Sequence, residues 1–327
     1  MTVEALTTRT LGRTGYEITT VGFGAWAAGG PVGTGANAVG WSGQDDSESV
    51  AAIRRAVDCG VSWIDTAPIY GLGHSEEIVA RALHGMAERP LVFTKCGFVW
   101  DESGEITQVL ERESIREQIE RSLQRLEVDV LDLVQIHWPM PDERIEEGWT
   151  ALAELKQEGK VLHIGVSNFS VEQLRRVGAI APVETLQPPY SLLDRDAERE
   201  ILPFAGGEDI GVIVWGPIAH GLLTGAWTRR RVEALPEDDF RRQNNQHFAE
   251  PAVTRNLAFV ERMRALAEQR GRTLIELALG WVLRDPYVTG AIVGLRRPEQ
   301  VDEIVRAAQV RLEDDELAEI EASLAQL

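Results

Sequence analysis

The chain has 327 residues, long enough to bury a large core, and its 33 basic and 52 acidic residues give a net charge of −19. This balance argues against a general surface for nucleic acids or anionic membranes, although it leaves room for a local basic pocket that binds a small phosphate ligand. Only two cysteines occur, Cys59 and Cys96, which excludes a disulfide framework and a cysteine-rich metal site.

The first residues lack the charged segment and apolar core of a signal peptide, and no run of about 18 apolar residues occurs. We therefore expect a cytoplasmic protein. Polar–apolar alternation around residues 11–15 then predicts a small β-hairpin. Short apolar runs predict eight buried strands, at 18–23, 61–65, 91–95, 130–136, 161–166, 185–187, 212–214 and 288–293.

Amphipathic segments between and after these strands predict helices. Asp46 or Ser47 is expected to cap the first helix, and Ser114 to Glu117 has the pattern of a capping box at the start of another. Later helices are predicted near 145–158, 171–177, 197–204, 253–269 and 273–283, from Pro298 onward and over 314–327. A polar segment at 226–251 interrupts the alternation and is long enough for a lid, or for a disordered surface loop.

Eight short apolar strands alternating with helices are typical of a parallel sheet that is buried on both faces. The fold class is therefore predicted as α/β, a (β/α)₈ TIM barrel with an N-terminal β-hairpin and extra C-terminal helices. No composition break divides the chain, so residues 1–327 are expected to form a single domain. A doubly wound open sheet is the alternative, and the absence of a G-x-G-x-x-G turn after the first strand disfavours it.

In such a barrel, the residues that follow each strand meet at one face. Polar and small residues occupy these positions here: Gly24, Asp65 with Tyr70 on the next loop, Lys95, His137, Ser167 with Asn168, Gln187, Trp215 and Gly294. Several of them also have an ordinary structural interpretation. Asp65 could cap a turn or form a structural ion pair with Lys95, and His137 could be a core histidine.

Taken together, four of these side chains predict acid catalysis. A tyrosine with an ordinary pKa near 10 is a poor proton donor unless a nearby ammonium favours the phenolate, and an aspartate would hold that ammonium in place. Lys95 and Asp65 supply such a pair for Tyr70, while His137 is suited to orient a carbonyl oxygen. Because none of these groups accepts a hydride, a redox reaction requires a cofactor.

The second half of the chain contains residues suited to hold one. Ser167, Asn168 and Gln187 match a carboxamide, and Trp215 could stack on an aromatic ring or could simply be a core residue. The loop Gly221–Gly225 would let backbone amides approach phosphates. Arg296 and Arg297 follow the last strand at the start of a helix, where barrels often bind phosphate, although a solvated basic turn is the alternative.

These residues give the chain a resemblance to the aldo-keto reductases over nearly its whole length. The matching segments are Asp65–Gly71, Thr94–Lys95, Gln135–Pro139, Gly165–Phe169 and Gly221–Gly225. Gln187–Leu192 and the Gly-x-Arg form of the last loop are most similar to the bacterial general-stress and inositol-utilisation reductases. The resemblance implies a barrel that binds NADPH/NADP+ at its C-terminal face without a Rossmann domain, and that reduces aldehydes or ketones.

By this resemblance the catalytic tetrad is Asp65, Tyr70, Lys95 and His137, with Tyr70 as the general acid. Ser167, Asn168 and Gln187 would hold the carboxamide, Trp215 would stack on the nicotinamide, Arg296 and Gln300 would meet the 2′-phosphate, and Glu303 would lie near the adenine. Further cofactor contacts are expected from Gly24, Ala25, Trp26, Asp65, Gly216, Pro217, Gly221, Leu222, Gly225 and Gly294. Ile304 departs from the asparagine of many relatives.

The main hypothesis is thus an NADPH-dependent reductase of a small carbonyl, sugar or polyol substrate, with no metal, no nucleic-acid partner and no membrane partner. Trp26, Trp100 and Trp138 are candidates to line an apolar mouth, or they are ordinary packing residues. Two alternatives stay open. One is a redox-sensing binding protein like the potassium-channel β subunits, and the other is a Schiff-base lyase that uses Lys95.

Overall fold

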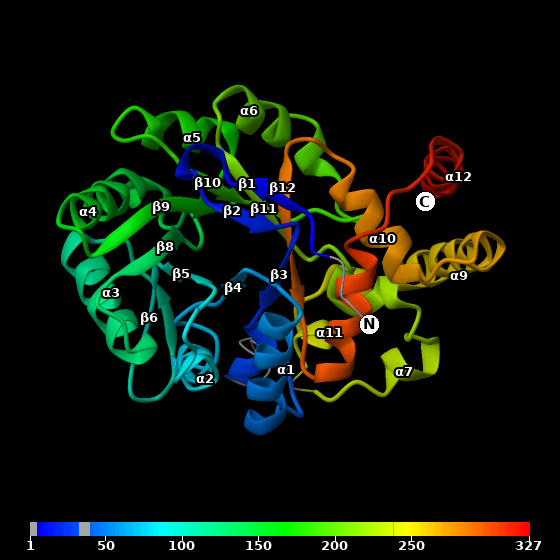
Figure 1. The fold of residues 1–327 in the computed structure, drawn as a ribbon, viewed down its shortest axis with the longest axis horizontal. Coiled ribbons are helices and arrows are strands. Elements are labelled where there is room, and N and C mark those ends of the chain that lie inside the picture. Colours follow the sequence, from blue (N-terminus) through cyan, green and yellow to red (C-terminus); the bar gives the residue numbers. More distant parts are fainter. Residues whose placement is uncertain (1–4, 33–39, 238) are drawn as a thin grey trace.

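A computed structural model describes residues 5–32, 40–237 and 239–327. Its centre is a closed barrel of eight parallel strands, which confirms the predicted fold class (Figure 1). Around the barrel the strands are β3 (Val21–Gly24), β4 (Trp63–Asp65), β5 (Leu91–Cys96), β8 (Leu131–Ile136), β9 (Val161–Ser167), β10 (Thr185–Gln187), β11 (Gly211–Trp215) and β12 (Val288–Gly294). The barrel closes where β12 pairs with β3, with Gly294 opposite Gly24.

Helices surround this barrel. The longer ones are α1 (Asp46–Asp58), α2 (His74–Leu83), α3 (Arg112–Leu126), α4 (Ile145–Gln157), α5 (Val171–Gly178), α6 (Ile201–Gly207), α9 (Ala252–Arg270), α10 (Leu274–Leu283), α11 (Pro298–Ala307) and α12 (Asp314–Leu324). The helix α12 lies outside the ring, beside α9 (Figure 1).

The pleat of the strands separates two apolar cores. A small core inside the barrel contains Trp63 and Phe93, whereas Ile64 and Val92 belong to the larger core between the strands and the helices. Side chains two residues apart point to the same side of a strand. Asp65 and Lys95 therefore continue the inner columns of Trp63 and Phe93 toward the C-terminal mouth. The same alternation that fills the barrel's floor aims the polar residues into its mouth.

A hairpin of β1 (Thr8–Thr10) and β2 (Glu17–Thr19) confirms the predicted turn around residues 11–15. It closes the base of the barrel, because the Trp63 indole donates to the carbonyl of Thr19 at 2.8 Å and Arg9 donates to the carbonyl of Leu283 at 2.7 Å. The predicted strand at 18–23 is wrong at its start. Residues 18 and 19 belong to β2 of the hairpin. The run 18–23 gave no sign of this boundary, because β2 and β3 both bury their side chains there.

Two predicted helix caps are also wrong. The cap of α1 is Asp45, whose carboxylate accepts from the backbone N–H of Glu48 at 2.9 Å. The helix α3 begins before the expected capping box, and Ser114 instead lies within it and accepts from Gln118. A tertiary contact, the backbone N–H of Arg112 donating to a carboxylate on α4, stabilises that earlier start, and no local pattern encodes it.

Two further segments lie near the mouth. An antiparallel pair, β6 (Phe98–Trp100) and β7 (Ile106–Gln108), follows β5 and was absent from the predicted elements. The described part of the polar segment 226–251 is folded, with α7 (Arg229–Glu233), α8 (Phe240–Gln243) and a 3₁₀ turn at Gln246–Phe248. Part of the glycine-rich stretch after β3 falls on residues 33–39, which lie outside the described residues.

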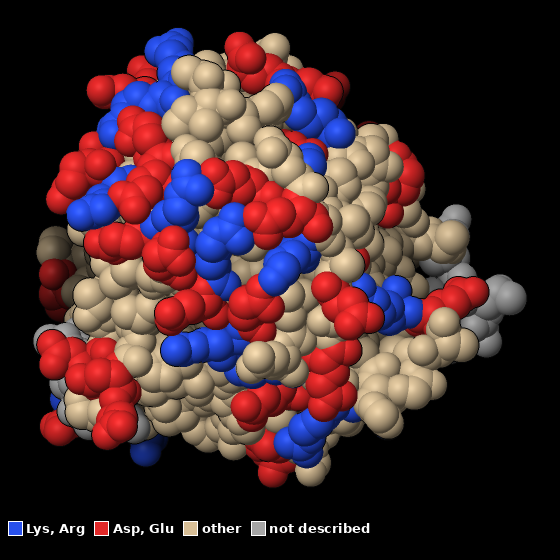
Figure 2. Space-filling view, turned by 90° about the vertical axis from the view of Figure 1, so that its left-hand side faces the viewer, with Lys and Arg blue, Asp and Glu red and all other residues tan. Residues whose placement is uncertain are grey.

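The outer face formed by α3, α4 and α5 shows acidic and basic side chains interleaved (Figure 2). Ion pairs join neighbouring helices there, such as Arg116 to Glu158 and Arg176 to Glu146. Much of the charge on this face is thereby neutralised locally, each exposed pair adding only about 0–1 kcal/mol to stability. Within the described ranges, no helix combines the length and apolar character needed to cross a membrane.

Candidate active site

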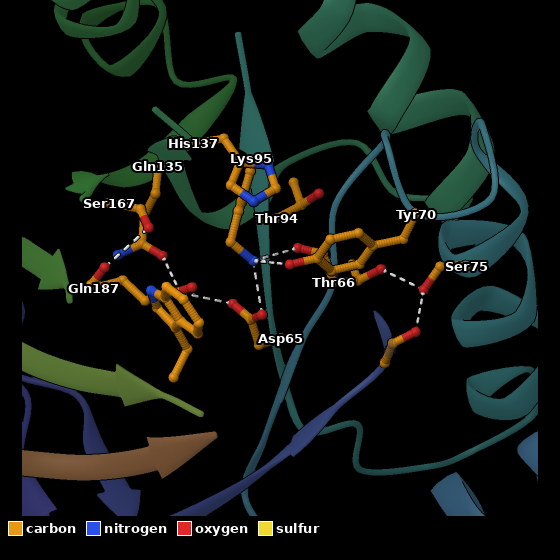
Figure 3. A network of polar contacts seen from close by, with 12 residues as sticks. Asp65, Thr66, Tyr70, Ser75, Thr94, Lys95, Gln135, His137, Ser167 and Gln187 are labelled. Atoms are coloured by element: carbon orange, nitrogen blue, oxygen red, sulfur yellow. Dashed lines mark hydrogen bonds and ion pairs between the residues drawn. The ribbon is translucent and has the colours of Figure 1, made fainter. Parts of the chain in front are cut away.

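A buried ion pair lies at the centre of the mouth (Figure 3). Lys95 Nζ is 2.7 Å from Asp65 Oδ1, donates to the carbonyl of Thr66 at 3.0 Å, and approaches the hydroxyl of Tyr70 at 3.4 Å. The side chain of Lys95 is fully buried and that of Asp65 nearly so. Each of the three N–H groups of the ammonium thus has a partner, and one of these partners is the hydroxyl oxygen of Tyr70.

A chain of amides holds the other side of the aspartate. Gln187 Nε2 donates to Asp65 Oδ2 at 2.9 Å and to Gln135 Oε1 at 2.8 Å, and Gln135 donates in turn to the hydroxyl of Thr185 at 3.0 Å. This chain crosses the barrel from β10 to β8 and β4. Gln135 was not among the predicted site residues, although its position two residues before His137 in a buried strand places it on the inner face.

His137 lies beside the tyrosine at the end of β8. Its ring centroid is 5.7 Å from that of Tyr70 and 5.3 Å from that of Phe98, in edge-to-face contacts. Its backbone is fixed by the N–H bond to the carbonyl of Cys96 and by Asn168, whose amide donates to the carbonyl of His137 at 2.9 Å. Burial, with the Lys95 charge as the second cause, holds the pKa of His137 well below its ordinary value near 6.5.

That pKa gives a testable pH dependence. We expect the imidazole of His137 to stay uncharged at neutral pH and at its ordinary pKa near 6.5, so its NMR resonances should show no titration centred there. An unfolded chain takes up the proton near pH 6.5, so the unfolded state gains protons first and the free energy of unfolding falls as the pH drops below 6.5. Chemical denaturation should show this loss weakened in His137→Asn, and an equal pH slope in both proteins would contradict it.

Burial also determines the pKa of Tyr70. The pKa of Tyr70 is raised well above 10, first by desolvation and second by the negative charge of Asp65. This is the opposite direction to the sequence expectation that Lys95 would lower it. The reason is that the phenol is deeply buried and that the carboxylate of Asp65 acts against the ammonium of Lys95, so desolvation decides the direction. Tyr70 therefore holds its proton firmly in this state.

A second buried carboxylate, which was not predicted, binds the residue that precedes Lys95. Glu76, on α2, accepts from the hydroxyl of Thr94 at 2.6 Å and from Arg125 at 2.6 Å, and its side chain is fully buried. The guanidinium of Arg125 also lies 5.8 Å from the ring of Trp100, on the β6–β7 pair. The loop that carries Tyr70 is thereby tied to β5 and α3.

The residues predicted for the carboxamide lie together beside His137. Ser167 donates to the carbonyl of Gln187 at 2.9 Å, and Asn168, at a positive φ of 64°, receives the Trp215 indole N–H at 3.0 Å. The amide nitrogen of Gln187 is directed at Asp65 and Gln135. Within this group, Asn168 and Trp215 are the partly exposed members.

The predicted phosphate-binding residues lie at the seam between β12 and β3. Arg296 donates from Nη1 to the carbonyl of Ser42 at 3.0 Å, whereas its Nη2 is buried without a hydrogen-bond partner among the described residues. Gln300 accepts from the backbone N–H groups of Arg296 and Arg297. Gly294 is exposed, and a Cβ added to it would touch nothing. A guanidinium N–H that has no partner in the described part of the chain, at a helix N-terminus and two residues after the exposed Gly294, fits a phosphate.

The other predicted cofactor contacts occupy loops around this seam. Gly216, Gly221 and Gly225 have positive φ values of 70°, 90° and 74°, which explains glycine at these turns. Among the remaining predicted contacts, four residues are buried: Gly24, Ala25, Pro217 and Leu222. Trp26 and Glu303 are partly exposed. Ile304, the residue that departs from the relatives, packs in the core with 5% of its surface exposed.

Aromatic residues that were not predicted cover the mouth. Trp41, His220 and Phe240 pack around Trp26, with ring centroids 5.0, 6.0 and 4.9 Å from it, and Trp26 itself lies 6.0 Å from Tyr70. These residues come from loops far apart in the sequence, so no local pattern points to their meeting. Of the other predicted mouth residues, Trp138 is 40% exposed. No cluster of three metal-binding side chains exists within the described ranges.

Comparison with known proteins adds independent evidence. The profile of the aldo/keto reductase family matches residues 22–325. The chain is 39% identical over 292 residues to aldo-keto reductase YhdN of Bacillus subtilis, covering 88% of this chain and 85% of the relative. It is 35% identical to the NADH-specific methylglyoxal reductase of Escherichia coli, covering 93% and 94%. The structure of the glycerol dehydrogenase AKR11B4 from Gluconobacter oxydans matches with a TM-score of 0.85 and 37% identity, covering 100% and 96%.

Proposed function

Because the chain belongs to the aldo/keto reductase family, whose members are oxidoreductases that use a nicotinamide cofactor, we propose that it reduces aldehydes and ketones reversibly with NADPH, as a single domain of 327 residues. One observation carries the proposal. The buried Asp65–Lys95 pair presents an ammonium group 3.4 Å from the hydroxyl of Tyr70, at the mouth of the barrel.

In this proposal Tyr70 is the general acid. A reduced nicotinamide, when bound, would supply the hydride that the carbonyl carbon accepts. Tyr70 gives its proton to the carbonyl oxygen. The raised pKa of Tyr70 keeps that proton in place until negative charge develops on the substrate oxygen. Lys95 then stabilises the phenolate that remains, and Asp65 holds Lys95 charged and in position.

His137 has a different role in the same step. Because its pKa lies well below 6.5, the ring is neutral and offers one N–H donor. From its place beside Tyr70 it can direct the carbonyl oxygen toward the phenol. A neutral donor suits this task, since a charged imidazolium would compete with Tyr70 as the acid.

The residues that would hold the cofactor are grouped along the mouth. Asn168 and Trp215 would meet the nicotinamide end, with Ser167 and Gln187 supporting them, and Arg296 with Gln300 would meet the 2′-phosphate. The Nη2 of Arg296, which has no hydrogen-bond partner among residues 5–32, 40–237 and 239–327, supports this assignment. One relative is described as NADH-specific, so the preference of this chain for NADPH over NADH has to be tested.

Arg296→Ala is therefore expected to weaken NADPH far more than NADH. A charged arginine–phosphate hydrogen bond contributes about 1.5–3 kcal/mol, equivalent to roughly one to two decades of affinity. Binding measured by quenching of tryptophan fluorescence would show this difference. Arg297→Ala is the matched control, because that side chain is exposed and paired with Glu48. Equal losses for both cofactors would remove Arg296 from the reading of the 2′-phosphate.

The substrate class follows from the mouth, where Tyr70 and His137 lie among aromatic side chains. We propose a small carbonyl compound or the corresponding sugar or polyol, in keeping with relatives described as a methylglyoxal reductase and a glycerol dehydrogenase. A panel of aldehydes, ketones and polyols assayed with NADPH and NADH tests the proposal. Absence of turnover with every member, despite cofactor binding, would favour a redox-sensing binding protein instead.

A further inference from the structure

A buried ion pair outside the barrel lies directly behind the proposed catalytic residues. Glu76 is on α2, just after the loop that carries Tyr70, and its side chain is fully buried. Its Oε2 is 2.6 Å from Nε of Arg125 on α3, whose side chain is 16% exposed. Taking two charges out of water costs free energy that their attraction often fails to recover, so a gain in stability explains this pair poorly.

The first contact of the pair joins Glu76 to the strand of Lys95. Thr94 precedes Lys95 on β5 and donates its hydroxyl to Glu76 Oε1 at 2.6 Å. Neighbouring residues of a strand point to opposite faces, so Lys95 is directed into the barrel while Thr94 is directed toward α2. A shift of β5 at Thr94 would therefore move the ammonium group relative to Tyr70, which it approaches at 3.4 Å.

The second contact joins the pair to the loop of Tyr70. The backbone N–H of Glu76 donates to the carbonyl of Gly73 at 3.1 Å, and that of Ser75 donates to the carbonyl of Tyr70 at 3.1 Å. Gly73 has a φ of 103°, and a Cβ added to it would lie 2.8 Å from Cδ of Arg125. Arg125 thus packs against the backbone of this loop, so the ion pair holds the loop as well as the strand.

Glu76 also affects the charge of Lys95. Within the described ranges, the charged or titratable side chains around this ammonium group are Asp65, Tyr70, Glu76, Arg125 and His137. Burial lowers the pKa of Lys95, and the negative charges of Asp65 and Glu76 oppose this effect. Without its charge, Glu76 would also leave Arg125 as an unpaired cation, and both changes disfavour the ammonium form of Lys95.

We propose that Glu76 and Arg125 form a positioning pair, which holds Lys95 at its distance of 3.4 Å from Tyr70 and keeps the lysine charged. This inference rests on the proposed function and adds two residues that act on the proton transfer without touching substrate or cofactor. Asp65 then fixes the lysine from inside the barrel, and the positioning pair fixes its strand from outside.

The first test is Glu76→Gln, which removes the charge but keeps an acceptor for Thr94. We expect kcat for the best aldehyde of the carbonyl panel to fall by up to about a hundredfold, as for a misplaced catalytic group. The alkaline limb of the pH profile of kcat should move to lower pH, because Lys95 loses its proton more easily. Affinity for NADPH should stay nearly unchanged, since the pair lies outside the barrel, between α2 and α3.

Thr94→Val separates position from charge. Valine has nearly the shape of threonine, so both charges of the pair stay while the hydrogen bond to β5 is lost. We expect kcat to fall and the alkaline limb to keep its wild-type position. This variant also decides the matter if Glu76→Gln does not fold. A lower kcat in Glu76→Gln with an unmoved alkaline limb would contradict the proposed effect on the charge of Lys95.

Glu316→Gln is the matched control. Glu316 is also buried, and its Oε1 is 3.0 Å from Nε of Arg272, but it lies on α12, outside the ring of helices (Figure 1). Urea denaturation should show a loss of stability in this variant as in Glu76→Gln, because both leave an arginine without its partner. The value of kcat and its pH profile should stay as in the wild type.

Wild-type kcat in both Glu76→Gln and Thr94→Val would overturn the inference. An equal loss of kcat in Glu316→Gln would overturn it as well, because general destabilisation would then explain the effect. The outcome for the proposed function is separate. If Tyr70→Phe keeps full turnover, the proposed function fails, whereas an inactive Tyr70→Phe beside fully active Glu76→Gln and Thr94→Val removes only the positioning pair.

Discussion

Replacing Tyr70 with phenylalanine is expected to abolish carbonyl reduction while leaving NADPH binding nearly unchanged. The substitution removes only the hydroxyl that Lys95 approaches at 3.4 Å and keeps the ring that packs on His137 and Trp26. A positioned general acid contributes about 10²–10⁴ in rate, so turnover should fall by at least that range. Steady-state assays with a small aldehyde and cofactor titration would measure the two properties separately.

The control for this substitution is Tyr287→Phe, at a residue that is 43% exposed and directly precedes β12, at the end of the barrel away from the mouth. It should be neutral for both activity and binding. Unchanged turnover in Tyr70→Phe would take the tyrosine out of the acid role. An equal loss of cofactor affinity would indicate instead that the hydroxyl supports the shape of the mouth.

Replacing Lys95 with methionine is expected to remove activity and to destabilise the fold. The methionine leaves the carboxylate of Asp65 buried without its cation and the carbonyl of Thr66 without its donor. Breaking a buried pair in this way costs about 3–5 kcal/mol of unfolding free energy. Urea denaturation would measure the loss, and assays under native conditions would show turnover falling along with it.

The double variant Asp65→Asn with Lys95→Met separates the two effects. With both charges removed, most of the stability should return, whereas activity should stay absent because the ammonium group beside Tyr70 is missing. Recovery of activity in the double variant would contradict the proposed role of Lys95. A separate experiment bears on a Schiff-base mechanism. Lys95 is fully buried and its Nζ is directed at Asp65, Thr66 and Tyr70, so borohydride should trap no substrate on it.

The sequence was sufficient to locate the barrel strands and the residues at their ends. Asp65 and Lys95 could be predicted as partners because a two-residue alternation and parallel pairing leave few places for a polar residue after a buried strand. The start of β3 was missed for the converse reason, since Ile18 is as buried as the strand that follows and gives no contrast in polarity.

What could not be predicted depends on contacts between distant segments. Trp41 and Phe240 look like ordinary aromatic residues in polar loops, and only the folded chain brings both against Trp26. The direction of the Tyr70 pKa was missed for a related reason: the sequence shows which charges are near, but the balance between an ion pair and desolvation requires the geometry. Gln187 was assigned to the carboxamide, and only its distances show the bond to Asp65.

The seam between β3 and β12 has a consequence for how the protein is made. These adjacent strands are far apart in the chain, so during synthesis the edge of β3 has no barrel partner on that side until residue 294 has left the ribosome. Until then, the nascent chain presents an open sheet edge, which is a hazard for wrong pairing. Gly294 ends β12 and Arg296 follows two residues later, so the corner proposed to bind phosphate is the last part of the mouth to be assembled. Slow translation or chaperone binding near that point should therefore favour correct closure over aggregation.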